Sequence, residues 1–316
     1  MIVFALRRAA ITIPVLLGVT LITYALINAA PGNAVTMLAD PLATEENRRA
    51  MEHALGLDAP IWVRYVLWLG QILTGNFGYS YVSNQPVLPL MLSHLPATLE
   101  LMAAALLIAY VVGIPLGVFV AVRQYSWYDY VTTFFAFVGI STPSFFLGLV
   151  LIYVFALQLN WLPPSGQYTL GGSRSLGDLL THLVMPAAIL ALNYLAITVR
   201  YVRGSVLEVL GQDYVRTARS KGLRERLVLY RHALRNALLP IITLAGLQVP
   251  SLFAGAVITE QVFAWPGMGQ FAIQAIGARD YPVLMSVTFV SATLVVVGNL
   301  VADLLYGVAD PRVRLS

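Results

Sequence analysis

The sequence of 316 residues contains no cysteine, and only 11% of its residues are charged. Without cysteine the chain forms no disulfide, thiolate metal site or lipid-anchored N-terminal cysteine, so we do not expect a lipoprotein. Soluble domains carry roughly 25% charged residues. Here 59% of the residues are hydrophobic and the mean hydropathy is +0.77. The composition therefore predicts an integral membrane protein.

Motifs of several catalytic classes are also missing. A phosphate-binding P-loop needs Gly-Lys followed by Ser or Thr, but the only lysine, Lys221, stands between Ser220 and Gly222. The four histidines include no pair at metal-ligand spacing, and no Gly-x-Ser-x-Gly elbow occurs. We therefore expect no enzyme, and no cofactor or metal bound by this chain.

Six uncharged apolar runs are near or above the roughly 20 residues that cross a bilayer as a helix. They are Ala9–Ala30, Leu101–Val122, Tyr130–Leu157, Leu179–Val199, Asn236–Thr259 and Tyr281–Ala302. None shows the alternation of barrel strands, so helices must satisfy the backbone in lipid. The predicted fold class is all-α, a polytopic membrane protein with six transmembrane helices.

The basic residues predict the orientation of these helices. With both termini in the cytoplasm, fourteen of the nineteen Lys and Arg residues lie inside and five lie outside. Cytoplasmic loops carry the excess of Lys and Arg, so cytoplasmic N and C termini are favoured. The pI near 9.3 then reflects membrane orientation, and no nucleic acid partner is expected.

This topology divides the chain into four regions. They are residues 1–30 with the first transmembrane helix, an extracytoplasmic cap at 31–95, a five-helix core at 96–308 with a cytoplasmic loop at 200–235, and a cytoplasmic tail at 309–316.

The cap contains two helix patterns. Thr44 can cap a helix whose first turn holds Glu45 and Glu46. A second apolar pattern follows Pro60 and ends near Gly75. Its aromatic rings suggest a position at the membrane interface. The cap is either a lid over helix ends or a docking surface for another protein.

The loop at 200–235 holds nine of the nineteen basic residues. Apolar residues at helical spacing form one face before Gly222 and a second face after it. The first face is Leu207, Leu210, Tyr214 and Ala218, and the second is Leu223, Leu227, Tyr230, Leu234 and Leu238. We expect two amphipathic helices joined at the glycine. Anionic lipid headgroups explain this pattern as well as a soluble partner does.

Two stretches of this loop carry a family resemblance. DYVRTARSKG at 213–222 and RHALRNALLP at 231–240 resemble the cytoplasmic coupling loop of permease subunits in bacterial ABC importers of the oligopeptide, dipeptide and nickel branch. LPATLE at 95–100, FAWPGMG at 263–269, RDYPV at 279–283 and DPR at 310–312 extend the likeness over essentially the whole chain. Importers at large carry Glu-Ala-Ala, three residues and then Gly, whereas Arg216, Thr217 and Ala218 precede Gly222 here. This departure is usual in the peptide branch.

The resemblance implies a type I ABC importer permease fold in the bacterial plasma (inner) membrane. It also implies a second homologous permease, two ATPase subunits that bind ATP and Mg, an extracytoplasmic substrate-binding protein and surrounding membrane lipid. The implied ATPase-coupling residues are Asp213, Tyr214, Arg216, Thr217, Ala218, Lys221, Gly222, His232, Arg235, Asn236 and Pro240. Those implied for docking the binding protein are Trp62, Tyr65, Trp68 and Asp280.

Other functions remain open from the residues alone. The cargo could be a dipeptide, an oligopeptide, glutathione or nickel, and a membrane scaffold without transport activity fits as well. An ion-coupled secondary transporter would place charges near the bilayer centre. Glu100, Glu260 and Asp303 lie at helix ends instead, where the helix dipole and headgroup water account for them, so ion coupling is disfavoured. With neutral spans, cargo choice is expected to reside in the external binding protein.

Overall fold

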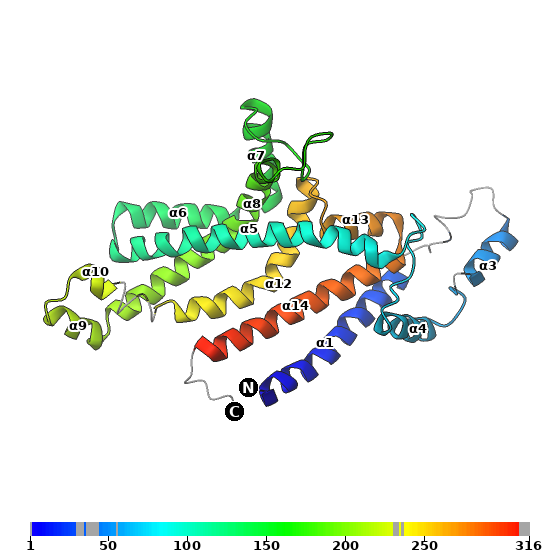
Figure 1. Cartoon of the computed structure of the whole chain (residues 1–316), viewed down its shortest axis with the longest axis horizontal. Coiled ribbons are helices and arrows are strands. Elements are labelled where there is room, and N and C mark those ends of the chain that lie inside the picture. Colours follow the sequence, from blue (N-terminus) through cyan, green and yellow to red (C-terminus); the bar gives the residue numbers. More distant parts are fainter. Residues whose placement is uncertain are drawn as a thin grey trace. The chain divides into compact units, whose positions relative to one another are not determined.

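The computed structural model describes residues 2–29, 35, 44–54, 56–229, 234 and 237–309. Within these ranges the chain is helical, with one isolated bridge between Tyr79 and Pro86 (Figure 1). The long helices are α1 (Ile2–Ala29), α5 (Val87–Val122), α8 (Leu176–Leu210), α12 (Leu239–Val262) and α14 (Tyr281–Ala309). The shorter ones are α3 (Glu45–Ala54), α4 (Ile61–Leu73), α6 (Trp127–Ser141), α7 (Ser144–Leu151), the π-helical η1 (Ile152–Gln158), α9 (Asp213–Ser220), α10 (Glu225–Leu227) and α13 (Met268–Ala278). The all-α prediction is confirmed for this part of the chain.

The chain forms two compact units. The larger unit comprises residues 98–265 and the chain from 297 onward, and the smaller unit comprises residues 2–97 and 266–296. α5 and α14 contribute one part to each unit.

The larger unit is built around α8, which packs against both α6 and α12. One of its buried clusters is drawn from α5, α8 and the chain that enters α12 and comprises Val118, Ala121, Val202, Val206, Ala237 and Ile241. Gly117 lets α5 approach α8 closely, because an added Cβ would stand 2.7 Å from Cβ of Val202 and 2.9 Å from the carbonyl oxygen of Val199. Small residues at such contacts let helix backbones pack tightly in membranes.

The third expected span is not one straight helix. α6 ends at Ser141, and α7 with η1 continues from Ser144 at an angle of 105°. Pro143 explains the break, since its ring lacks an N–H and disfavours the α conformation for the preceding residue. Thr142 accordingly adopts an extended ψ of 130°. The apolar run alone did not reveal this change of direction.

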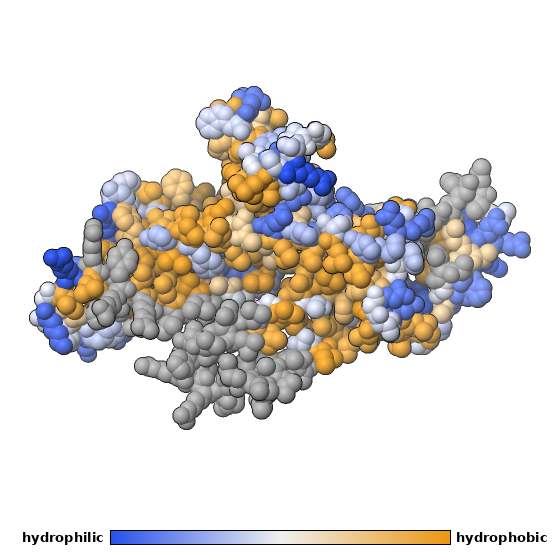
Figure 2. All heavy atoms as spheres, viewed as in Figure 1, coloured by the Kyte–Doolittle hydropathy of each residue, from blue (hydrophilic) through white to orange (hydrophobic). Residues whose placement is uncertain are grey.

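Four helices in the described part of the chain are long and apolar enough to cross a membrane, or five if the bent pair counts as one span. They lie in α1, α5, α8 and α14. α12, with 24 residues, covers most of the fifth expected run. Figure 2 shows apolar residues along the helices of the larger unit and hydrophilic residues at α9 and α10. On α6 the exposed aromatic side chains include Tyr130, Phe134 and Phe137, as expected for a lipid-facing surface.

In the smaller unit both predicted helices of the cap are present. α3 begins at Glu45, and Oγ1 of Thr44 accepts a hydrogen bond from the amide of Asn47 at 3.3 Å. α4 begins directly after Pro60 and ends before Gly75, whose φ is +82°. The unit's buried cluster comes from α5, α13 and α14 and comprises Val87, Met91, Met268, Ala275, Val283 and Val287.

Candidate functional site: the α9–α10 hairpin

The loop predicted to carry function forms a short helical hairpin at the end of α8 (Figure 1). α8 ends at Leu210, and Gly211 and Gln212 turn the chain before α9 begins. Asp213 lies in the first turn of α9 and Arg219 in its last turn. Each charge opposes the partial charge at its end of the helix, which favours this short helix.

Gly222 ends α9 in the left-handed region, with a φ of +76°. The amide of Gly222 donates to the carbonyl of Arg219 at 2.9 Å, and the amide of Lys221 donates to that of Thr217 at 3.1 Å. Among the described residues, no atom beyond the chain neighbours of Gly222 lies within 4 Å of an added Cβ, so the requirement for glycine comes from the backbone angle. The predicted turn at Gly222 thus separates α9 from the short α10, and most of the second predicted helix, residues 230–233, 235 and 236, lies outside the described residues.

An ion pair closes the hairpin across this glycine. Arg219 donates from Nη2 and Nε to the two carboxylate oxygens of Glu225, at 2.6 and 3.2 Å. The hydrogen bonds from Arg219 hold the pKa of Glu225 below its ordinary value. The contribution of the pair is therefore complete above the ordinary pKa of Glu225, and it is lost only as the pH falls through the lowered value.

The buried face of the hairpin differs from the predicted one. Val215 and Ala218 of α9 pack with Val228, whereas Tyr214 is 43% exposed and Leu227 is also exposed. The predicted face assumed one unbroken helix from Leu207 through Tyr214. The turn at 211–212 resets the helical phase, so Val215 takes the place of Tyr214 on the inward face, while Ala218 faces inward as predicted.

The coupling residues implied by the family resemblance do not share one environment. Ala218 is buried, and Gly222 forms the turn. The exposed coupling residues are Asp213, Tyr214, Arg216, Thr217 and Lys221. Pro240 lies in the first turn of α12. His232, Arg235 and Asn236 lie outside the described residues.

A buried ion pair ties α6 to α8 in the larger unit. Arg203 donates from Nε and Nη2 to the two oxygens of Asp129, both at 2.7 Å, and Oδ2 also accepts from the amide of Tyr125 at 3.1 Å. The side chains of Asp129 and Arg203 are 5% and 28% exposed. Close by, the hydroxyl of Ser205 donates to the carbonyl of Ala237 at 3.0 Å, which links α8 to the chain entering α12. Sequence reasoning missed this pair. The signal that could have indicated the pair was an aspartate, Asp129, directly before the apolar run that begins at Tyr130.

The docking residues implied for the smaller unit do not share one surface. Trp62 is 70% exposed, whereas the hydroxyl of Tyr65 lies 2.9 Å from Oγ1 of Thr20 on α1. Trp68 is partly buried beside the ring of Phe289. Asp280 is buried.

The carboxylate of Asp280 organises a loop. It accepts hydrogen bonds from the hydroxyl of Ser80 at 2.5 Å, from the amide of Tyr81 at 3.1 Å and from that of Val82 at 3.4 Å. The aspartate of the RDYPV motif therefore holds residues 80–82 in place within the smaller unit.

The position of Glu260 at a helix end predicted a solvated side chain, and this prediction is wrong. It is completely buried in the larger unit, and its carboxylate accepts a hydrogen bond from the hydroxyl of Thr98 at 2.6 Å. This contact joins the LPATLE segment to the last turn of α12. Among the described residues no three His, Asp or Glu side chains are grouped as a metal site would require.

Comparison with known families assigns the chain to one of them. Residues 113–315 match the binding-protein-dependent transport system inner membrane component, and residues 1–102 match the N-terminal region of such membrane components. The chain belongs to this family. This inner membrane component is thus a transporter part rather than an enzyme, and the importer resemblance noted in its sequence is confirmed.

Curated relatives cover this inner membrane component from end to end. It is 44% identical to the oligopeptide transport system permease protein AppB of Bacillus subtilis (strain 168), over 98% of this chain and 99% of the relative. It is 39% identical to the dipeptide transport system permease protein DppB of Escherichia coli (strain K12), over 99% of both chains. A solved structure of the MetNI methionine ABC transporter in an inward-facing conformation matches with a TM-score of 0.58 and 18% identity, over 71% of this chain and 97% of that one. The fold is therefore shared with a chain of an ABC transporter.

Proposed function

We propose that this chain is one permease subunit of a binding-protein-dependent ABC importer for peptides and that it forms half of the translocation path. The single observation that carries this proposal is the α9–α10 hairpin, a polar projection with a glycine turn at the end of α8. The full-length likeness to relatives named as oligopeptide and dipeptide permeases supports peptide cargo.

In this proposal the ATPase activity and its ATP and Mg reside in two partner subunits, and a second homologous permease completes the path. α9 inserts into a cleft of one ATPase through its exposed residues. The ion pair between Arg219 and Glu225 keeps the hairpin rigid, so that movement of the ATPase reaches α8. The contact between Arg203 and Asp129 then transmits that movement to α6.

The cargo is selected mainly by the external binding protein in this mechanism. The expected spans contain no charge at the bilayer centre that would recognise a peptide terminus or a metal ion. Discrimination requires unfavourable contacts with the wrong ligand, which a neutral path supplies poorly.

The experiment that tests the function is ATP-driven uptake in proteoliposomes that contain this chain, its partner permease and both ATPase subunits. We expect uptake of labelled dipeptides or oligopeptides only when ATP and the binding protein are present. Exchange for a compatible binding protein of different specificity should change the cargo without any change in this chain.

Other outcomes discriminate the alternatives. Uptake driven by an ion gradient without ATP would identify a secondary transporter. An intact complex that transports no cargo would favour the function of a membrane scaffold without transport activity. Uptake of glutathione or nickel in place of peptides would change only the proposed cargo, and the proposed importer function would stand.

We also propose six spans with both termini in the cytoplasm in an inner membrane, and cysteine labelling tests this topology. Ser220 on α9 and Ala50 on α3 are both exposed, and the natural chain has no cysteine. An impermeant thiol reagent should label Ser220→Cys only in inside-out vesicles and Ala50→Cys only in spheroplasts, because the basic residues favour cytoplasmic termini. The reverse labelling would overturn both the topology and the ATPase contact.

A further inference from the structure

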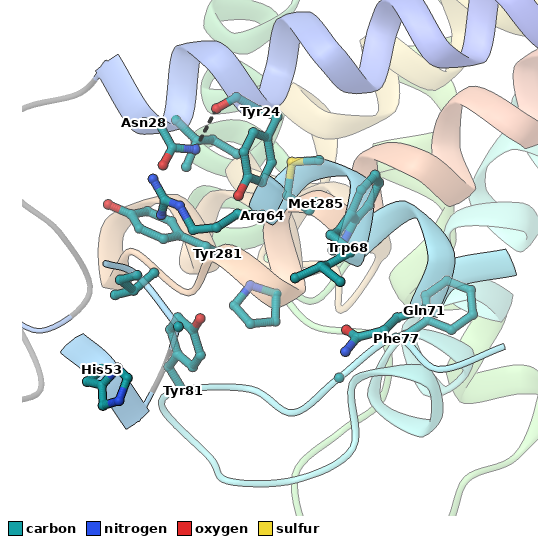
Figure 3. Close-up of a pocket in the computed structure, with 16 residues that line it drawn as sticks. Tyr24, Asn28, His53, Arg64, Trp68, Gln71, Phe77, Tyr81, Tyr281 and Met285 are labelled. Carbon is teal, nitrogen blue, oxygen red and sulfur yellow. Dashed lines mark hydrogen bonds between the residues drawn. The ribbon is translucent and has the colours of Figure 1, made fainter. Parts of the chain in front are cut away.

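The smaller unit encloses a cavity of about 420 Å³ that the importer mechanism does not use. It lies where α1 ends and α14 begins. The end of α3 with residues 56–57, α4 and the loop after α4 form the other walls (Figure 3). A cavity of this size falls in the range of small-molecule sites. Its polar lining includes Asn28, Arg64, Trp68, Gln71 and Tyr81.

Among the described residues the lining is rich in hydrogen-bond donors and contains no carboxylate. Nε of Arg64 and Nε1 of Trp68 are both buried and have no hydrogen-bond partner in the described part of the chain. No described carboxylate forms an ion pair with Arg64 either. Buried donors without partners are costly, so this arrangement calls for a ligand with acceptor oxygens and negative charge.

A tyrosine hydroxyl adds a further donor to the lining. Burial, together with the nearby carboxylate of Asp280, raises the pKa of Tyr81 to about 12. The hydroxyl therefore keeps its proton at neutral pH. Figure 3 shows the Arg64 side chain in the same part of the pocket as Tyr24, Asn28 and Tyr281.

The position of the cavity suggests where the anion comes from. α1 and α14 contain candidate membrane spans, and the cavity contacts the last turns of the first span and the first turns of the second. Both helices would thus meet the same membrane face at this level. α4, with 13 residues, is too short to cross the bilayer, yet it exposes Trp62, Val66 and Leu73. Such a helix lies in the interfacial layer, where lipid phosphates are found.

We propose that this cavity binds the phosphate group of a membrane phospholipid, with Arg64 as the charged donor and Trp68 as a second donor. Guanidinium groups match phosphate oxygens in charge and geometry. The exposed side chain of Leu67, which also lines the cavity, is positioned to contact the start of an acyl chain. A peptide fits less well, because the described residues of the lining offer no carboxylate to its ammonium group. The site does not depend on the proposed transport function.

Lipid retention by the full-length chain in detergent tests the proposal. Phosphatidylglycerol is added, and the lipid that stays bound is measured by native mass spectrometry. Arg64→Gln should weaken retention at least about tenfold, the loss expected when a charge-assisted hydrogen bond is removed. Trp68→Phe keeps an aromatic ring and removes one donor, so a loss of several-fold is expected. Arg49→Gln is the matched control, because Arg49 is exposed on α3 of the same unit and does not line the cavity.

Competitors identify the source of the anion. Diacylglycerol, which lacks the phosphate, should not be retained, and neither inorganic phosphate nor dialanine at millimolar concentration should displace the lipid. Displacement by inorganic phosphate would identify a free-anion site, and displacement by dialanine would identify a peptide site. Either result overturns the proposal, as does equal retention by Arg64→Gln and Arg49→Gln. If Arg64→Gln does not fold, the proposal is tested by Trp68→Phe and Arg64→Lys, and retention equal to that of the natural chain by both variants overturns it.

Discussion

Replacement of Asp129 by asparagine is expected to lower the free energy of unfolding of the chain by about 3 kcal/mol. The change removes the charge that faces the guanidinium of Arg203 and leaves that cation largely buried without a counter-ion. Breaking a buried ion pair costs about 3 to 5 kcal/mol, and the remaining exposure of Arg203 places this pair at the lower end. Denaturant titration of the full chain in detergent micelles measures the change.

Two further variants distinguish the stability lost by breaking the ion pair from the effect of removing any one charge. Asp213→Asn removes a carboxylate that is 97% exposed, where a surface pair is worth less than about 1 kcal/mol. The double variant Asp129→Leu with Arg203→Met removes both charges and should recover most of the lost stability, because neither charge remains buried alone. If Asp129→Asn is as stable as Asp213→Asn, the pair does not hold α6 to α8.

Valine at position 222 is expected to reduce uptake by the reconstituted importer about five- to thirty-fold. A φ of +76° is rarely adopted by L-residues, and least of all by β-branched ones. A left-handed conformation costs roughly 1 to 2 kcal/mol per residue, which lowers the population of the native hairpin by this factor. Uptake of labelled peptide and ATP hydrolysis are measured in the same vesicles. Membrane insertion and expression should remain normal, because no described atom crowds the position.

Asparagine provides the matched control at the same position. Its side chain tolerates the left-handed region, so Gly222→Asn should retain most of the uptake that Gly222→Val loses. Alanine should lie between the two. Uptake by Gly222→Val equal to that of the natural chain would show that the hairpin is a lipid-facing helix with no part in coupling.

The sequence by itself determined the class of protein and the local features of its helices. Long uncharged runs leave helices as the available structure in lipid, because each backbone group needs a partner within its own segment. The start of α3 after Thr44, the start of α4 after Pro60 and the joint at Gly222 were predictable for a similar reason. Each depends on backbone angles and hydrogen bonds within a few residues, which the local sequence specifies.

Only the tertiary structure decided which side chains face one another. Asp129 and Arg203 are separated by 74 positions, and Thr98 and Glu260 by 162 positions. Helical periodicity indicates that a face is apolar, but it does not identify the partner of that face, and a two-residue turn was enough to exchange Tyr214 for Val215 at the buried position. The cavity beside Arg64 likewise requires four helices and two loops to meet. Contacts of this kind depend on the path of the whole chain, which determines whether a charge is solvated, paired or left for a ligand.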